Sequence, residues 1–272
     1  MLQRTVRYEF RRTEESELRG GKSSNAVQQY FSLAYTGKKE GLDSFNYQVS
    51  QVSQTNHKGL YAWVEDLSPL MSNLQLGISD NGRIKRVFNL SSVYQRWQNK
   101  IWYETKQKHK GEENRDAMLE NTDALLLDEP AFANSLCYAP PFSLLFSGLH
   151  GMVFENRKEE KRKGRLLGFA GAPFLPLSLE DEITVSGNPD ESYEVKTEGK
   201  IDEKMFDKKL FSNFVRTISN DPTAVDDLLT RHTERYLFDR YQWVKNGMWL
   251  HLSAVPYFMM REERCFLKSL KS

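Results

Sequence analysis

Cysteine is scarce in this sequence. The two cysteines, Cys137 and Cys265, lie far apart, so the chain has no disulfide framework, and their spacing does not match a zinc site. Two free thiols indicate a reducing compartment. No uninterrupted apolar run reaches the roughly 18 residues that a membrane-spanning helix needs. The first residues show neither a leader nor a lipidation motif. We therefore expect a cytoplasmic protein without a membrane span.

An excess of charge of either sign is also missing. The chain has 38 Lys and Arg against 37 Asp and Glu, for a formal net charge of +1. A near-neutral chain gives no general attraction to nucleic acids or anionic membranes, so we expect no nucleic-acid partner. Hydrophobic residues make up only 39% of the chain, but the aromatic content is 12%. Aromatic rings bury much area per residue, which indicates a folded protein.

Alternation of apolar and polar residues predicts strands in three parts of the chain. In the first 90 residues we expect strands near 6–10, 27–35, 45–49, 60–64, 74–79 and 83–89. Strands resume near 165–170, 174–179, 182–186 and 193–197, and a long hairpin covers 231–266. Asp80-Asn81-Gly82 and Asn246-Gly247 suit tight hairpin turns, because Asn and Gly tolerate positive φ. These stretches are therefore predicted to form antiparallel meanders.

Helical spacing replaces this alternation in two blocks. Val93, Tyr94, Trp97 and Ile101 share one helical face, and a second helix is expected over 114–127. Residues 131–137 form a further helical turn. The second block begins with Asp202 as a helix cap, and Asp221-Pro222 begins the next helix in the favoured order.

Strands in meanders with helices inserted in blocks predict an α+β fold. We expect a curved antiparallel sheet, built of meanders with Asn-Gly hairpins, that wraps two inserted helical blocks in a half-barrel-like arrangement. A single domain over residues 1–272 is predicted, with a two-lobe division near 154–165 as the alternative. The order of elements resembles the half-barrel folds of periplasmic lipoprotein carriers. No motif accompanies this resemblance, so it implies no site residues.

The sequence contains few signs of catalysis. No histidine pair has metal-ligand spacing, no Gly-x-Ser-x-Gly elbow occurs, and Cys137 lies in an apolar setting that raises a thiol pKa. The Glu194-Val195-Lys196 triplet, with Asp181 upstream, matches the acid-x-Lys pattern of some metal-dependent nucleases. This pattern is common by chance, and a metal-dependent hydrolase is our third hypothesis. We expect no enzyme, cofactor or metal.

An irregular apolar segment, residues 138–154, is the best candidate for a surface that contacts a partner protein. Its prolines and glycines prevent a regular element, and such segments often shape pockets or interfaces, although plain core is the simpler explanation. The charged turn at 157–165 follows. The predicted partner-binding residues are Phe142, Leu144, Leu145, Phe146, Arg157, Lys161 and Arg162.

We therefore expect a non-enzymatic protein-binding module, such as an adaptor, a chaperone or a toxin-neutralising (immunity-type) partner. It would act through this apolar patch and through exposed sheet edges, with another protein as its partner. The alternative is a carrier of an apolar small molecule or lipid in a half-barrel cavity, lined by Trp63, Trp97, Trp102 and Phe146.

Overall fold

The computed structural model divides the chain into two compact units. The first comprises residues 1–10, 27–152 and 269–272, and the second comprises residues 11–26 and 153–268. The structure describes residues 5–18, 21–112, 115–137, 139, 141–146, 148, 160–166, 177–188, 192–202, 204–205, 209, 238–245, 248–258 and 261–270.

The N-terminal part of the chain contains a five-stranded antiparallel sheet that is curved and unclosed. It lies in the first unit except for strand residues 11–18 and 21–26, which belong to the second. Its strand order is β5-β4-β3-β2-β1, so neighbours in sequence are neighbours in space, as a meander requires. The strands are β1 (Thr5–Leu18), β2 (Gly21–Lys39), β3 (Leu42–Gln54), β4 (Asn73–Ile78) and β5 (Ile84–Val87). Together with the inserted helices, this sheet confirms the predicted α+β class.

Tight turns join these strands as the sequence predicts. Glu40 and Gly41 both have positive φ (52° and 78°) between the paired residues Lys39 and Leu42, which is the two-residue turn typical of hairpins. At the next hairpin, Gly82 has a φ of 75° and its N–H donates to the Ser79 carbonyl at 2.7 Å. The glycines are placed where the chain must adopt the left-handed conformation.

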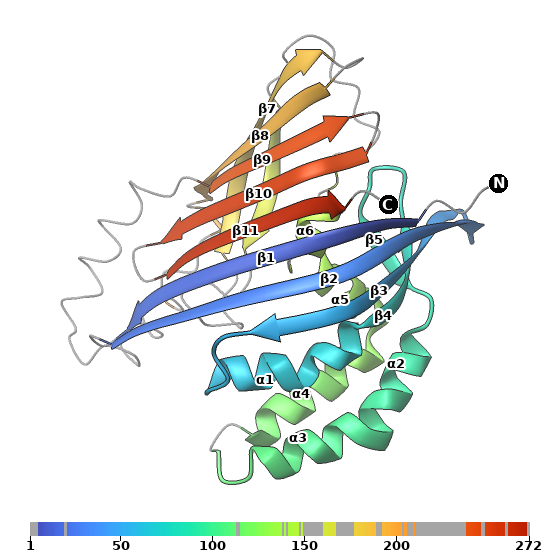
Figure 1. Ribbon diagram of the computed structural model, residues 1–272, viewed down its shortest axis with the longest axis vertical. Coiled ribbons are helices and arrows are strands. Elements are labelled where there is room, and N and C mark those ends of the chain that lie inside the picture. The colour runs from blue at the N-terminus through green and yellow to red at the C-terminus, as the bar shows by residue number, and fades with distance from the viewer. Residues whose placement is uncertain are drawn as a thin grey trace. The chain divides into compact units, whose positions relative to one another are not determined.

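The helices of the first unit follow β3 and β5, and Figure 1 shows them gathered below and behind its strands. The first group is α1 (Leu60–Leu67) with the 3₁₀ helix η1 (Ser68–Met71). After β5, one continuous helical run comprises α2 (Leu90–Arg96), the π-helix η2 (Trp97–Ile101) and α3 (Trp102–Lys108). The rest are α4 (Arg115–Leu127), α5 (Glu129–Leu136) and α6 (Phe142–Leu145).

One element of this unit was predicted wrongly. Residues 60–64 were expected as a strand, but they begin α1, in which Ala62 and Trp63 are buried while Val64 is half exposed. A short apolar run cannot be assigned to strand or helix from its spacing alone. Adjacent buried residues beside an exposed one fit a helix that lies with one face against the protein, rather than a strand with alternating faces.

Aromatic rings connect the sheet to the helices in the core of the first unit. Tyr8 stacks on Phe31 with ring centroids 5.2 Å apart, Phe31 lies 4.9 Å from Tyr47, and Tyr47 lies 4.7 Å from Phe142 in α6. Tyr47 and Trp97 have no exposed surface at all. The core is therefore filled with rings that come from three strands and from α6.

The second unit contains antiparallel strands in the order β11-β10-β9-β8-β7-β6. The Asn246-Gly247 turn lies outside the described residues, but the strands on either side pair as a hairpin would, with Met248 opposite Lys245. The strands are β6 (Glu160–Leu166), β7 (Leu177–Asn188), β8 (Ser192–Ile201), β9 (Phe238–Lys245), β10 (Met248–Phe258) and β11 (Arg261–Leu270).

The second predicted helical block falls on residues that the structure does not describe, apart from its first few. Asp202 is buried, and its carboxylate accepts a hydrogen bond from the Lys204 backbone N–H at 3.2 Å. A capping residue makes this kind of contact, but the helix that Asp202 would begin lies outside the described residues, so its role as a cap stays a prediction.

Candidate functional site

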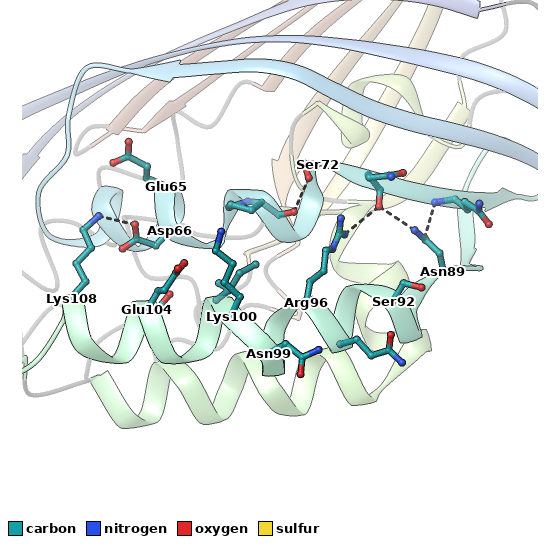
Figure 2. A pocket seen from close by; sticks show the side chains of 16 residues that line it. Glu65, Asp66, Ser72, Asn89, Ser92, Arg96, Asn99, Lys100, Glu104 and Lys108 are labelled. Carbon is teal, nitrogen blue, oxygen red and sulfur yellow. Dashed lines mark hydrogen bonds and ion pairs between the residues drawn. The ribbon is translucent and has the colours of Figure 1, made fainter.

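The first unit contains a groove of about 980 Å³ between its helices and the start of β4. One wall is formed by α1, η1 and the start of β4, and the other by α2, η2 and α3 (Figure 2). Its lining is mainly amide and charged side chains. The residues are Glu65, Asp66, Pro69, Ser72, Asn73, Gln75, Asn89, Ser92, Gln95, Arg96, Asn99, Lys100, Ile101, Glu104, Thr105 and Lys108.

The π-helix keeps one face of the long helical wall in the core. Buried residues recur every fourth position there, at Val93, Trp97, Ile101 and Thr105. In a regular α-helix a spacing of four drifts around the axis by about 40° per step, because four residues exceed one turn. The wider turn of η2 (i→i+5) offsets this drift. The polar side chains beside these residues consequently stay on the groove side, and π-turns are frequent at functional sites.

Two side chains hold the edge of β4 at the groove. The Asn89 amide accepts from the Gln75 N–H at 2.8 Å and donates to the Asn73 carbonyl at 3.1 Å, as a neighbouring strand would. The Arg96 guanidinium donates to the Leu70 and Asn73 carbonyls at 3.4 Å each. These bonds satisfy backbone groups that β5 does not reach, and they tie the two walls together.

At the opposite end of the groove, Asp66 bridges the walls. Its carboxylate accepts from the Lys108 ammonium at 2.7 Å and from His109 Nε2 at 2.8 Å. Figure 2 shows Lys108 reaching from α3 to Asp66 on α1. The groove is therefore fixed at both ends by side-chain bonds between its two walls.

The buried side chain of His109 is the centre of a polar cluster, which we call the His109 cluster (Trp63, Asp66, His109, Glu112). The imidazole is 3% exposed and stacks on the Trp63 indole with ring centroids 4.0 Å apart. Nδ1 lies 2.7 Å from Glu112 Oε1, and Trp63 Nε1 donates to Glu112 Oε2 at 2.8 Å. Each ring nitrogen of His109 therefore lies within hydrogen-bond distance of a carboxylate oxygen.

These contacts predict an acid-sensitive contribution to stability. The hydrogen bonds from Trp63 and His109 hold the pKa of Glu112 below its usual value. A carboxyl whose folded-state pKa is lowered stabilises the fold above its unfolded pKa, and this contribution is lost as the pH falls through the folded-state value. We expect the urea midpoint to fall as the pH is lowered from 7 to below about 4, the ordinary Glu pKa. Glu112→Gln should weaken this dependence, and an unchanged pH profile would contradict the assignment.

Four predicted partner-binding residues belong to the core of the first unit. Phe142, Leu144, Leu145 and Phe146 are 2–4% exposed. Phe142 packs on Tyr47, and the Phe146 ring lies 6.1 Å from that of Phe45. This is the simple core role that the sequence also allowed. The segment 138–154 was predicted to have no regular secondary structure, but residues 142–145 form one helical turn, α6.

The basic predicted residues fall in the second unit. Arg157 lies outside the described residues, whereas Lys161 and Arg162 lie on β6 rather than in a turn. In register, Lys161 is opposite Glu182 and Arg162 is opposite Asp181. Residues of opposite charge at facing positions favour strand pairing, so a dense run of charges does not require a solvated loop. The partner-binding roles of these residues remain predictions.

The residues of the nuclease pattern lie on two neighbouring strands, β7 and β8. In register, Glu194 is opposite Ser186, Lys196 is opposite Thr184, and Asp181 is opposite Gly199. The metal-dependent hydrolase stays a hypothesis.

The aromatic residues predicted to line a carrier cavity are mostly packed. Trp63 is in the His109 cluster, Phe146 is buried, and Trp97 is fully buried with its Nε1 donating to Asp123 at 3.0 Å. Trp102 is partly exposed and has the Lys106 ammonium 4.3 Å from its ring centroid. None of the four lines the groove.

The thiol of Cys137 fits its predicted character. Burial raises its pKa, as expected for an unreactive thiol in an apolar setting. Within the described ranges, no group of three or more His, Cys, Asp or Glu side chains is arranged to hold a metal ion. No helix in the described part of the chain combines the length and apolar character needed to cross a membrane.

Comparisons with known proteins identify no family. No family model matches the sequence, and no curated protein matches it. Among solved structures, a chain described as "lipid-protein interactions in lipovitellin" matches with a TM-score of 0.40 and 8% identity. The match covers 98% of this chain and 25% of that one, so this chain spans a quarter of its length. A likeness of this size supports no statement about fold or function.

Proposed function

We propose that this chain is a non-enzymatic protein-binding module, of the adaptor, chaperone or toxin-neutralising kind, and that it holds a polar segment of its partner in the groove. The observation that carries the proposal is the groove itself: about 980 Å³ of open space lined mainly by amide and charged side chains. The apolar residues proposed for contact are packed in the core instead.

The chemistry of the lining suits a polypeptide. Side-chain amides, such as those of Gln95 and Asn99, both donate and accept, so they can bond to the N–H and C=O groups of an extended backbone. Lys100 and Glu104 add charges of both signs along the same wall. Mixed charges select a partner with the complementary pattern and reject others.

The rigidity of the groove supports the same conclusion. Asn89 and Arg96 fix one end, and Asp66 with Lys108 and His109 fixes the other. A preformed site loses less conformational entropy when a ligand binds.

A charge exchange within the groove tests the proposal. In the double variant Lys100→Glu/Glu104→Lys the net charge is unchanged, but the pattern along the wall is reversed. We expect affinity for the native partner, captured with wild-type protein and identified by mass spectrometry, to fall by about tenfold or more. The matched control is Lys85→Glu/Glu120→Lys, at exposed positions outside the groove. Equal binding by the groove variant and the control would remove the groove as the contact site.

A further inference from the structure

The charged side chains of the groove form two groups, and the first is already bonded within the protein. Asp66 accepts from Lys108 at 2.7 Å and from His109 at 2.8 Å. Glu65 Oε2 lies 2.8 Å from His57 Nδ1. A partner that bound these groups would first have to break contacts that the protein already makes.

The second group, Arg96, Lys100 and Glu104, lies along the helical wall and has no opposite charge bound to it among the described residues. Lys100 and Glu104 are exposed, and neither makes a hydrogen bond or ion pair there. Arg96 donates from Nη2 to the Leu70 and Asn73 carbonyls at 3.4 Å each, and these neutral acceptors leave its positive charge without a counter-ion. Figure 2 shows Arg96 and Lys100 pointing from the helical run towards the opposite wall.

The order and spacing of these charges fit an extended segment. The positive residues Arg96 and Lys100 are followed by the negative Glu104, with four residues from each charge to the next. Four residues advance a helix by about 6 Å, and an extended chain covers that distance in about two residues. Side chains two apart on an extended chain point to the same side. A segment with an acidic residue at Lys100 therefore presents the residue two positions away to Glu104.

The same wall disfavours other anions. A nucleic acid or a uniformly acidic peptide would bring negative charge to Glu104 as well as to Lys100, and like charges repel. Single-stranded nucleic acids also stack their bases on aromatic rings, and no aromatic residue lines the groove within the described ranges. The wall therefore suits one anionic group beside one cationic group.

We propose that the partner segment carries an acidic and a basic residue two positions apart. The carboxylate of the acidic side chain, Asp or Glu, binds to Arg96 and Lys100, and the basic side chain pairs with Glu104. The side-chain amides of Gln95 and Asn99 on the same wall bond to the backbone of the segment. This inference rests on the proposed binding of a polar segment in the groove, and it specifies the chemistry of that segment.

Three synthetic peptides with capped ends and a fluorescent label test the spacing on the full chain. Gly-Ser-Glu-Ser-Lys-Ser-Gly and Gly-Ser-Lys-Ser-Glu-Ser-Gly place the charges two apart, in the orders that match a segment running in either direction. Gly-Glu-Ser-Ser-Lys-Ser-Gly has the same composition with a spacing of three. We expect fluorescence polarisation to show that one of the first two binds about fivefold tighter than the third, because each exposed charge pair contributes modestly. If neither does, the proposal is wrong.

Paired substitutions test the contact with Lys100. Replacing Glu with Gln in the tighter peptide should weaken binding about threefold for the wild-type chain, but at most about 1.5-fold for Lys100→Gln, where the carboxylate has lost one of its two partners. The matched control is Lys85→Gln, at an exposed lysine outside the groove, which should retain the full effect. Circular dichroism would verify that both variants remain folded. Equal effects in Lys100→Gln and the wild type would overturn the contact.

The two proposals for the groove can fail separately. If binding of the captured native partner is insensitive to Lys100→Glu/Glu104→Lys, the groove does not hold that partner, and this inference falls with the proposed function. If that variant loses the partner but the peptides show no preference for a spacing of two, the groove binds a polar segment and only the inferred charge pattern is wrong.

Discussion

Replacing Trp97 with alanine should lower the free energy of unfolding of the first unit by about 3–5 kcal/mol. Trp97 has no exposed surface, and it is the first residue of the π-helix. Its removal leaves a cavity the size of an indole beneath the groove wall, and Asp123 loses the hydrogen bond from the ring. Urea denaturation followed by far-ultraviolet circular dichroism measures the change.

A milder substitution separates the contribution of the buried apolar volume from that of the hydrogen bond to Asp123. Trp97→Phe keeps most of the apolar volume and removes the hydrogen bond to Asp123. Gln98 still donates to the same carboxylate oxygen at 2.6 Å, so the aspartate retains a partner. We expect a loss of only about 1–2 kcal/mol for this variant. If Trp97→Ala unfolds within about 1 kcal/mol of wild type, this residue does not pack as described.

The second large effect is expected at His109. His109→Ala removes the hydrogen bonds to Asp66 and Glu112 and the stacking on Trp63. A cavity then replaces the imidazole, and Asp66 and Glu112 each lose one partner while keeping Lys108 and Trp63 respectively. We expect a loss of about 2–4 kcal/mol. Because the His109 cluster holds α1 against the end of α3, groove binding should weaken as well.

His109→Phe is the matched comparison. A phenyl ring retains the stacking on Trp63 but makes neither hydrogen bond. If the polar contacts dominate, this variant should lose nearly as much stability as His109→Ala. A Phe variant as stable as wild type would show that stacking and packing alone hold this end of the groove.

The meanders of this fold could be predicted because their signals are local. Apolar residues alternate with polar ones along β1 to β3, which predicts strands from a few neighbouring residues. Turn residues such as Gly41 and Gly82 predict the hairpins in the same local way. The helix α1 could not be assigned in the same way. Its apolar run is short, and only packing of Trp63 against His109, far along the chain, distinguishes helix from strand.

The groove could not be predicted because its walls come from separate parts of the sequence. Asp66 and Lys108, for example, are brought together only by the packing of α1 on α3. Polar lining residues such as Asn89 and Asn99 look like ordinary surface residues in the sequence. The apolar positions from Val93 to Ile101 are spaced by four, which indicates a helix but does not distinguish the widened turn of η2 from an ordinary α-helix.

The apolar segment shows what burial adds to the sequence pattern. Proline and glycine suggested an irregular stretch that would form a contact surface, but Phe142 and Phe146 pack on rings of β3. Sequence alone does not tell a core segment from a binding segment, because both need apolar side chains and only the surrounding strands decide which is covered.

Site-specific photo-crosslinking tests the central claim, that the groove holds a partner protein, most directly. A photoreactive phenylalanine analogue would replace Asn99 in the groove or, as the control, Asn134 on α5, an exposed residue outside it. After irradiation in native cells, we predict one dominant protein adduct from position 99 and none from position 134. The adduct should disappear in the Lys100→Glu/Glu104→Lys background. The same adducts from both positions, or none from position 99, would contradict the claim.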